Sequence, residues 1–299
     1  MRLRGKAMTV ISRIGRRGLL ALLATLALML GSLVAAPTSA YAASTISVKV
    51  KGDVDYAEAY AFLDKLNKLR SSKGLTPLVM DKALLKAAEQ RAAELSVEYS
   101  HTRPNGKKPA SVSSYVAGEN IAIASADADA AYTVWKNSPP HYANMTRGSF
   151  RTAGICCFES NGMTYWVNLF GTKKSGSVSR SSATKTKTRT VKVAKKYLTK
   201  KYLHLSPSSM ETYDSDKVIV YFRPPFAEKE GILPNSLFTF KSSKTSVLTV
   251  SKKGVLKSKK AGKARLTATL KKKKSCKLAK TIKVKDSDYF DSDLYGADD

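Results

Sequence analysis

The charge of this 299-residue chain is distributed so unevenly that it divides the chain into parts. Residues 44–172 hold 15 lysines and arginines against 12 aspartates and glutamates, whereas residues 173–285 hold 31 against 5. Residues 286–299 hold six aspartates and no basic residue. The chain is therefore expected to consist of a near-neutral domain, a strongly basic segment and a short acidic tail.

The first 43 residues have the layout of a secretory signal peptide. Residues 1–17 carry six basic side chains and no acidic one, residues 18–36 form an uncharged apolar run, and mostly small residues follow. Cleavage is expected near Ala42 or Ala43. An uncleaved membrane anchor is the alternative, because 18 or more apolar residues can span a bilayer. We expect an extracellular protein, secreted through this signal peptide, that can associate with the cell wall.

Residues 55–172 are predicted to form one domain that mixes helices and strands. Apolar residues recur at helical spacing after Asp55, which with Glu58 forms a capping box, and again after Asp81. The hairpin signal Asn161-Gly162 separates two runs of β-forming residues. The predicted helical segments are residues 55–70, 81–99, 127–136 and 142–145, and the predicted strands are residues 152–159 and 164–170.

The three cysteines do not form a disulfide framework, because Cys156 and Cys157 are adjacent and Cys276 is distant. Side chains alternate along a strand, so one of the adjacent pair is expected to face the core and the other to face outward. The inward cysteine is interpreted as a small buried hydrophobic residue. No metal site is expected from the cysteines alone.

The basic segment is predicted to have two parts. Residues 173–196 are rich in Ser, Thr and Lys and are predicted to be a basic flexible linker. Residues 197–285 contain seven short runs of β-forming residues separated by turn residues, which favours an all-β sandwich. The acidic tail, residues 286–299, can either fold back on the basic sheet or stay disordered.

Two of the three histidines lie in polar segments of the first domain. His101 belongs to a turn-rich loop, Glu119 follows a glycine, and His141 follows two prolines. Rigid polar segments around ionisable residues can preorganise a site. We therefore take His101, Glu119 and His141 as a candidate polar cleft, with packed or surface histidines as the alternative.

Motif-bearing stretches run in order along residues 55–171. They are residues 66–70, 74–78, 87–92, 100–106 (SHTRPNG), 118–122 (GENIA), 135–145 (WKNSPPHYANM), 154–155 and 165–171 (YWVNLFG). These stretches resemble the CAP superfamily of cysteine-rich secretory, antigen 5 and pathogenesis-related proteins, in its short bacterial, SCP-like form. The resemblance implies an α+β fold for this domain, a three-layer α-β-α sandwich.

The resemblance also implies a set of site residues. In the family a cleft holds two histidines and two acidic residues, and some members bind a divalent metal such as zinc there. His101, Glu119 and His141 match three positions, and Ser138 stands where the animal and plant branch has the second acid. This departure puts metal binding in doubt, although two imidazoles, a carboxylate and water can form a zinc site. No other cofactor is expected.

Residues 240–269 resemble the bacterial Ig-like group 2 domain. The resemblance rests on a serine-rich turn, Val247 and Val250, the Gly254-Val255 step and the Ala261-Gly262 pair. It implies an Ig-like spacer or adhesive module over residues 197–285, without an active site.

The positive charge of this module exceeds what solubility needs. Nucleic acid is not expected as a partner, because an exported chain without aromatic stacking patches is poorly suited to it. We therefore expect salt-sensitive attachment to anionic cell-wall polymers or to an anionic lipid surface.

Two functions are open for the cleft. Many family members bind sterols, fatty acids or partner proteins, so the resemblance favours a non-catalytic extracellular binding protein with a lipid or protein ligand. The alternative is an extracellular hydrolase, a peptidase or esterase-like enzyme, in which His101, Glu119 and His141 are catalytic. Three further residues, Ser138, Asn120 and Asn144, are expected to line the cleft, although a buried Asn often hydrogen-bonds loop backbone instead.

Overall fold

The computed structural model describes residues 44–287. The predicted signal peptide and all but the first two residues of the predicted acidic tail lie outside the described residues. Within residues 44–287, no helix combines the length and the apolar composition that a membrane crossing needs. The described residues belong to one compact unit, in which we distinguish an N-terminal half, residues 44–196, and a C-terminal half, residues 197–287.

Three of the four helices of the N-terminal half begin within one residue of their predicted starts, and the fourth begins at Pro139, three residues before the predicted start at Tyr142. They are α2 (Tyr56–Ser71), α3 (Lys82–Val97), α4 (Ala128–Lys136) and α5 (Pro139–Met145), with a 3-10 turn at Pro109–Val112. Three aspartates that precede α2, α3 and α4 accept hydrogen bonds from backbone N–H groups of the first turn. Only half of the predicted capping box forms, because the Glu58 carboxylate accepts from the N–H of Ala128 at 2.7 Å and ties α4 to α2.

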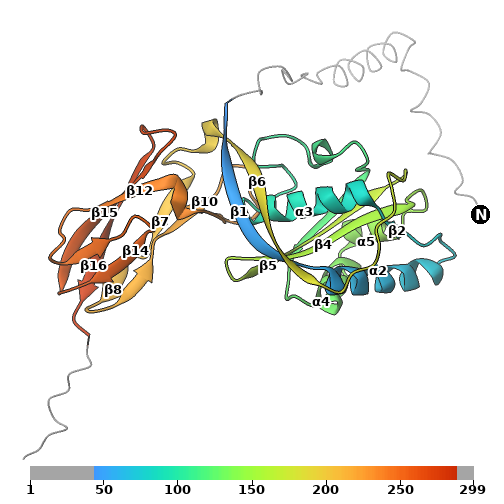
Figure 1. The fold of residues 1–299 in the computed structure, drawn as a ribbon, viewed down its shortest axis with the longest axis horizontal. Coiled ribbons are helices and arrows are strands. Elements are labelled where there is room, and N and C mark those ends of the chain that lie inside the picture. Colours follow the sequence, from blue (N-terminus) through green and yellow to red (C-terminus); the bar gives the residue numbers. More distant parts are fainter. Residues whose placement is uncertain (1–43, 288–299) are drawn as a thin grey trace, which may run out of the picture. The chain divides into compact units, whose positions relative to one another are not determined.

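A mixed sheet lies between these helices. Its strands are β1 (Thr45–Asp55), β2 (Val79–Met80), β3 (Gly118–Ile123), β4 (Thr152–Ser160), β5 (Met163–Gly171) and β6 (Thr184–Ala194). They run in the order β3-β5-β4-β1-β6, with β2 paired in parallel to β4. Figure 1 shows α3 over one face of the sheet and α2 and α4 over the other. The α-β-α layering follows, and Phe62, Trp135 and Trp166 are fully buried in its core.

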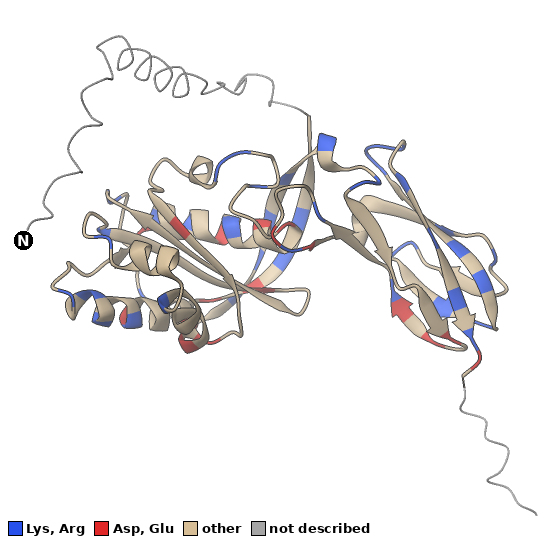
Figure 2. Cartoon of the chain, turned by 180° about the vertical axis from the view of Figure 1, so that it is seen from behind, with Lys and Arg blue, Asp and Glu red and all other residues tan. Residues whose placement is uncertain are grey.

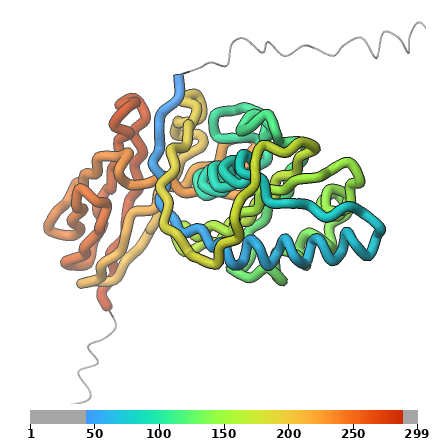
Figure 3. Tube along the Cα trace, turned by 45° about the vertical axis from the view of Figure 1, so that its right-hand side comes forward, coloured from blue at the N-terminus to red at the C-terminus, as the bar shows by residue number. Residues whose placement is uncertain are grey.

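The segment predicted as a flexible linker, residues 173–196, contains β6 instead. This strand pairs with β1 in antiparallel register from Thr45↔Ala194 to Asp55↔Thr184, and Figure 3 shows the two running side by side. The alternation of Lys or Arg with Thr and Val in β6 suits a strand with one solvated face. β6 also covers buried Glu89 of α3, which pairs with Lys187 and Arg189 and accepts a hydrogen bond from the Tyr56 hydroxyl at 2.6 Å.

The prediction that one of the adjacent cysteines faces outward is wrong. Cys156 and Cys157 are both buried, and both are free thiols. The cause is the layering, because helices cover both faces of β4 and a strand covered on both faces has no outward side. The hairpin between β4 and β5 forms as predicted, with positive φ angles at Asn161 (54°) and Gly162 (72°).

The C-terminal half is built of β-strands. They are β7 (Leu203–Ser206), β8 (Ser209–Glu211), β9 (Ser215–Lys217), β10 (Ile219–Phe222), β11 (Gly231–Leu233), β12 (Phe238–Ser242), β13 (Leu248–Val250), β14 (Val255–Ser258), β15 (Gly262–Leu270) and β16 (Lys277–Lys285), with 3-10 turns at Lys195–Tyr197 and Asn235–Leu237. They form three sheets, β11-β10-β7, β12-β15-β16-β8 and β13-β14-β9. All seven predicted strands are present, which confirms a β-rich region.

Candidate functional site

His101 and Glu119 meet directly although they come from different parts of the N-terminal half. His101 lies in the loop after α3, and Glu119 is the second residue of β3. Their atoms Nδ1 and Oε1 are 2.9 Å apart. The Glu119 side chain is 3% exposed, whereas that of His101 is 46% exposed. The imidazole of His101 is therefore accessible to solvent on one side and hydrogen-bonded to the buried carboxylate of Glu119 on the other.

A buried arginine that the sequence analysis did not select holds Glu119 in place. Arg91, on α3, is fully buried, and its Nε donates to Glu119 Oε2 at 2.8 Å. One terminal nitrogen reaches Glu119 Oε1 at 3.3 Å and donates to the carbonyl of Ser100 at 2.8 Å. A planar guanidinium can bridge a carboxylate and a carbonyl in this way. Arg91 thus fixes both β3 and the start of the loop that carries His101.

A second charged pair fixes the rest of that loop. Arg103 donates to Glu94 from Nη2 at 2.6 Å and from Nε at 2.9 Å, and Arg91 donates to the same carboxylate at 2.9 Å. Glu94 is buried, so both of its oxygens need hydrogen-bond donors, and these two arginines supply them together with the Gln90 amide at 3.1 Å. The loop that carries His101 is therefore anchored to α3 on both sides of the histidine.

His141 is held beside this pair through its backbone. Pro139 and Pro140 occupy the first turn of α5, where a missing N–H does no harm. The amide of buried Asn120 donates to the His141 carbonyl at 3.0 Å, and Asn144 donates to the Asn120 side chain at 2.9 Å. Asn144 also donates to the Glu119 carbonyl at 3.3 Å, so both asparagines tie α5 to β3 through a backbone acceptor. Their place in the lining of the cleft stays a prediction.

The remaining predicted residue, Ser138, is half-buried and stands immediately before α5. Its hydroxyl does not cap the helix. The Nδ1 atom of His141 is buried without a hydrogen-bond partner in the described part of the chain. We call His101, Glu119, His141 and Arg91 the polar site.

The two imidazoles of the polar site titrate in opposite directions. The hydrogen bond to Glu119 raises the pKa of His101 above its ordinary value, against the opposing effects of burial and Arg91. Burial and the positive charge of His101 lower the pKa of His141. His101 therefore keeps its proton to a higher pH than His141 does, and between the two pKa values a charged imidazole lies beside a neutral one.

Glu119 and Arg91 stabilise each other's charge. Burial alone raises the pKa of Glu119, but hydrogen bonds from His101 and Arg91 and the charge of Arg91 bring it below the ordinary value. Burial likewise opposes the charge of Arg91, and Glu119 and Glu94 outweigh it and raise the pKa of Arg91. Neither group changes charge over the physiological pH range.

Glu98 behaves differently from its neighbours. It follows α3, is fully buried, and both carboxyl oxygens lack a hydrogen-bond partner among residues 44–287. Burial raises the pKa of Glu98 to about 9, against the attraction of Arg91. This carboxyl is therefore neutral at pH 7.

The polar site does not fit a metal ion in this arrangement. In the part of the chain that the structure describes, no group of three or more His, Cys, Asp or Glu side chains is placed to hold one. Both oxygens of Glu119 are already bonded to Arg91 and His101, so an ion there would have to displace one of these partners. Ser138 brings no second carboxylate.

One family model matches the chain. Residues 63–170, roughly a third of the chain, match the CAP family, described as the cysteine-rich secretory protein family. The chain therefore contains a CAP domain over these residues, and the polar site lies within it. No curated protein matches.

Solved structures of bacterial proteins are similar to part of the chain. An extracellular protein with an SCP domain from Bacillus anthracis is 22% identical over 40% of this chain, with a TM-score of 0.37. A cysteine-rich secretory protein from Staphylococcus aureus is 20% identical over 40%, with a TM-score of 0.34. The similarity spans 41% and 40% of those two proteins. An outer surface protein from Borrelia burgdorferi is 18% identical over 44% of this chain and 99% of its own, with a TM-score of 0.34.

Proposed function

We propose that this protein is a secreted, non-catalytic binding protein of the cell surface. Its N-terminal half binds a ligand at the polar site, and its basic C-terminal half, proposed to be a bacterial Ig-like module, attaches to an anionic surface. The observation that supports binding most directly is the pairing around Glu119. Both oxygens of its carboxylate are hydrogen-bonded to Arg91 and His101, so the exposed edge of His101 is the group that a ligand can reach.

The absence of a nucleophile supports binding over hydrolysis. Among residues 44–287, no hydroxyl or thiol hydrogen-bonds to the imidazole of His101 or His141. Covalent catalysis needs such a group next to its base. One feature favours the alternative hydrolase, because a carboxylate on Nδ1 orients an imidazole as a general base that could activate water.

An activity screen separates the two functions. The purified chain without residues 1–43 is assayed on peptide, peptidoglycan and ester substrates, beside the His141→Ala and His101→Ala variants. We expect no turnover above buffer for any of the three. Turnover by the native chain that disappears in His141→Ala would overturn the non-catalytic proposal.

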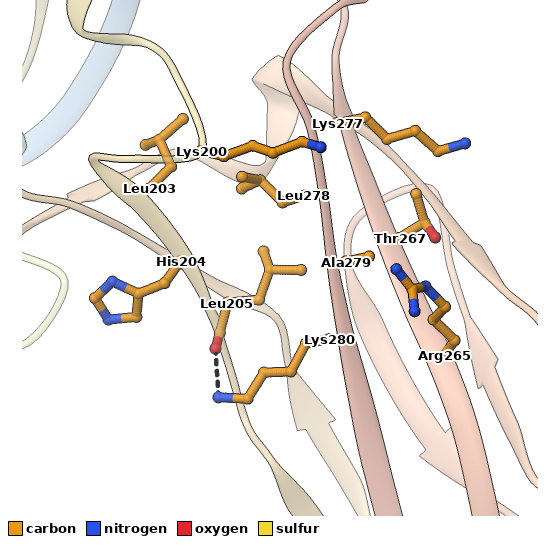
Figure 4. A pocket seen from close by; sticks show the side chains of 10 residues that line it. All are labelled: Lys200, Leu203, His204, Leu205, Arg265, Thr267, Lys277, Leu278, Ala279 and Lys280. Carbon is orange, nitrogen blue, oxygen red and sulfur yellow. Dashed lines mark hydrogen bonds between the residues drawn. The ribbon is translucent and has the colours of Figure 1, made fainter.

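The surface attachment proposal rests on the distribution of basic side chains. Figure 2 shows Lys and Arg spread over the strands of the C-terminal half. One hollow of about 730 Å³ lies between β7 and the two central strands, β15 and β16, of the four-stranded sheet, and it is lined by no acidic residue. Lys200, Arg265 and Lys277 extend around it in Figure 4, while Lys280 donates to the Leu205 carbonyl at 2.8 Å. Grouped cations of this kind attract phosphate-rich polymers and anionic headgroups.

The test compares two variants of equal charge. The triple variant Lys200→Gln, Arg265→Gln and Lys277→Gln removes three cations from the hollow. Its control, Lys252→Gln, Lys253→Gln and Lys257→Gln, removes three exposed cations elsewhere in the same half. Retention is measured against salt on inorganic polyphosphate beads and on phosphatidylglycerol vesicles.

We expect release of the native chain by about 0.5 M salt, where the Debye length falls to a few ångströms. The first variant should be released at lower salt than the control. Retention that ignores salt on both surfaces would overturn electrostatic attachment. Equal release of the two variants would overturn the role of the hollow.

A further inference from the structure

The loop between β10 and β11, residues 223–230, reaches the chain segment that carries His101. The backbone N–H of Glu228 donates to the Tyr99 carbonyl at 2.9 Å, and Lys229 forms an isolated antiparallel bridge with Tyr99. The Lys229 ammonium lies 5.7 Å from the centre of the Tyr99 ring. Tyr99 stands two residues before His101, so the C-terminal half touches the polar site's own loop.

Close backbone packing holds this contact in place. Gly231 begins β11 immediately after the loop, and a Cβ atom built there would meet the carbonyl oxygen of Val97 and the N–H of Glu98. The backbone of β11 therefore approaches the end of α3 more closely than any other residue type allows. The loop is also packed on its other side, where the rings of Phe226 and Tyr197 are 4.9 Å apart edge to face.

Glu228 is the unpaired carboxylate of this contact. It is exposed, and its side chain has no ion pair or hydrogen bond among the described residues. Its negative charge nevertheless acts on the polar site, since it adds to the rise in the pKa of His101 and offsets part of the fall in the pKa of His141. The other charged groups that act on His101 are Glu119, on β3, and Arg91, on α3, and the other charged group that acts on His141 is His101 itself.

We propose that the polar site is composite, with the loop of residues 223–230 as one of its sides and Glu228 as its free carboxylate. The proposal deepens the binding function proposed above and rests on it. Both oxygens of Glu119 already accept hydrogen bonds from Arg91 and His101, whereas the carboxylate of Glu228 is available to a ligand. An available carboxylate beside imidazole N–H donors suits a ligand that carries a protonated amine next to hydrogen-bond acceptors.

The three histidines of the chain make the first test direct. Imidazole resonances of the chain without residues 1–43 are assigned with single His→Gln variants and followed by NMR against pH. In Glu228→Gln, the titration midpoints of both His101 and His141 should fall relative to the native chain. The control is Glu230→Gln, which removes a neighbouring carboxylate that lies 3.6 Å from His204. It should leave both midpoints unchanged.

A second variant separates charge from position. Gly231→Ala keeps Glu228 but forces β11 away from α3, so the midpoints of His101 and His141 should fall there as well. Unchanged midpoints in Glu228→Gln would overturn the composite site, because the loop would then not face the imidazoles. That result leaves ligand binding at the exposed edge of His101 intact, so it is distinguishable from failure of the proposed function.

The ligand class is tested with two sugars that differ in one charge. Glucosamine carries a protonated amine, and N-acetylglucosamine carries a neutral amide on the same ring. Glucosamine should shift the His101 resonance at lower concentration than N-acetylglucosamine does. Glu228→Gln should weaken glucosamine about two- to fivefold, the usual value of an exposed carboxylate–ammonium contact, and leave the neutral sugar unchanged. Equal binding of the two sugars, or of neither, would overturn the amine preference.

Discussion

The two halves of the molecule place their charges in opposite ways. In the N-terminal half, seven acidic or basic side chains are buried, the neutral Glu98 among them, all from residue 70 to residue 119: Arg70, Asp81, Glu89, Arg91, Glu94, Glu98 and Glu119. In the described part of the C-terminal half, the buried polar side chains are the neutral Thr212, Ser242 and Ser258. Ionisable side chains therefore lie in the interior of the N-terminal half and on the surface of the C-terminal half. The buried groups act through the exact positions of their partners, whereas the surface groups act through how many positive charges there are.

The largest expected effect comes from breaking the buried network. Arg91→Met should lower the free energy of unfolding by about 3–5 kcal/mol, because it leaves Glu119 and Glu94 buried without their shared cation. Urea unfolding followed by tryptophan fluorescence is the measurement, since both tryptophans, Trp135 and Trp166, lie in the N-terminal half.

The matched change in the other half is Arg265→Met. Arg265 lies on the exposed side of β15, so the same substitution should change the unfolding free energy by no more than about 0.5 kcal/mol. A cost comparable to that of Arg91→Met would remove the contrast between the halves.

An increase in stability is expected when the buried, unpaired Glu98 is replaced by glutamine. Because the folded-state pKa of Glu98 is about 9 against an ordinary 4.5, the neutral carboxyl favours folding below pH 4.5, and this contribution is lost as the pH rises towards 9. Glu98→Gln cannot ionise. It should therefore be more stable than the native chain by about 3 kcal/mol at pH 7 and by less than about 1 kcal/mol at pH 5.

Urea unfolding at the two pH values measures this difference. The control is Glu94→Gln, which loses two arginine partners and should be destabilised at both pH values. If Glu98→Gln is no more stable than the native chain at pH 7, the carboxyl is not held neutral.

The contact between the halves should be worth less than the buried network. Gly231→Ala should cost about 1–3 kcal/mol, because the added methyl group meets fixed backbone atoms of Val97 and Glu98. Gly148→Ala is the control, since its Cβ would lie at an ordinary 3.7 Å from Leu75. Thermal unfolding of the two variants gives the comparison, and equal melting temperatures would show that β11 does not press on α3.

The smallest effect is expected at the exposed member of the polar site. Because the folded-state pKa of His101 is raised, its contribution to stability is full below the ordinary value and is lost as the pH rises through the folded value. His101→Gln should therefore destabilise the chain more at pH 5.5 than at pH 8.5. The difference should stay below about 1 kcal/mol, because the side chain is half exposed. Urea unfolding at both pH values measures it, and a larger loss at pH 8.5 contradicts the raised pKa.

Local patterns predicted the helices, the hairpin strands β4 and β5 and seven strands of the C-terminal half, because each of these carries its own signal. They did not predict β1, β2, β3, β8, β9 and β11. Asp55, Asp81 and Asp127 cap helices that the periodicity had placed, and the seven β-forming runs of the C-terminal half all became strands. The pairing of β1 with β6 was missed. The lysines and threonines of β6 are typical of a solvated linker. The segment forms a strand because it pairs with β1, which lies about 140 residues earlier in the chain.

The polar site was only partly predictable for a similar reason. His101, Glu119 and His141 stand in recognisable motifs, and the first two do meet. Arg91 sits among alanines on a helix, where nothing local distinguishes a buried cation from a surface one. What distinguishes Arg91 is its ion pair with Glu119, which is 28 residues later in the chain. Glu228 is more than a hundred residues from the loop of His101 that it approaches. Such partners are set by tertiary packing rather than by local sequence.

The strand pair β1 and β6 has a practical consequence for where the CAP domain can be cut. A fragment trimmed to the matched residues, 63–170, loses both strands and exposes the backbone edge of β4 that β1 covers at Asp53–Asp55. It also strips Glu89 of Tyr56, Lys187 and Arg189 together. An unpaired strand edge can pair with another chain, and a buried acid without its hydrogen-bond and ion-pair partners destabilises the fold, so this fragment is expected to aggregate. The smallest soluble fragment is therefore expected to run from residue 44 to residue 196.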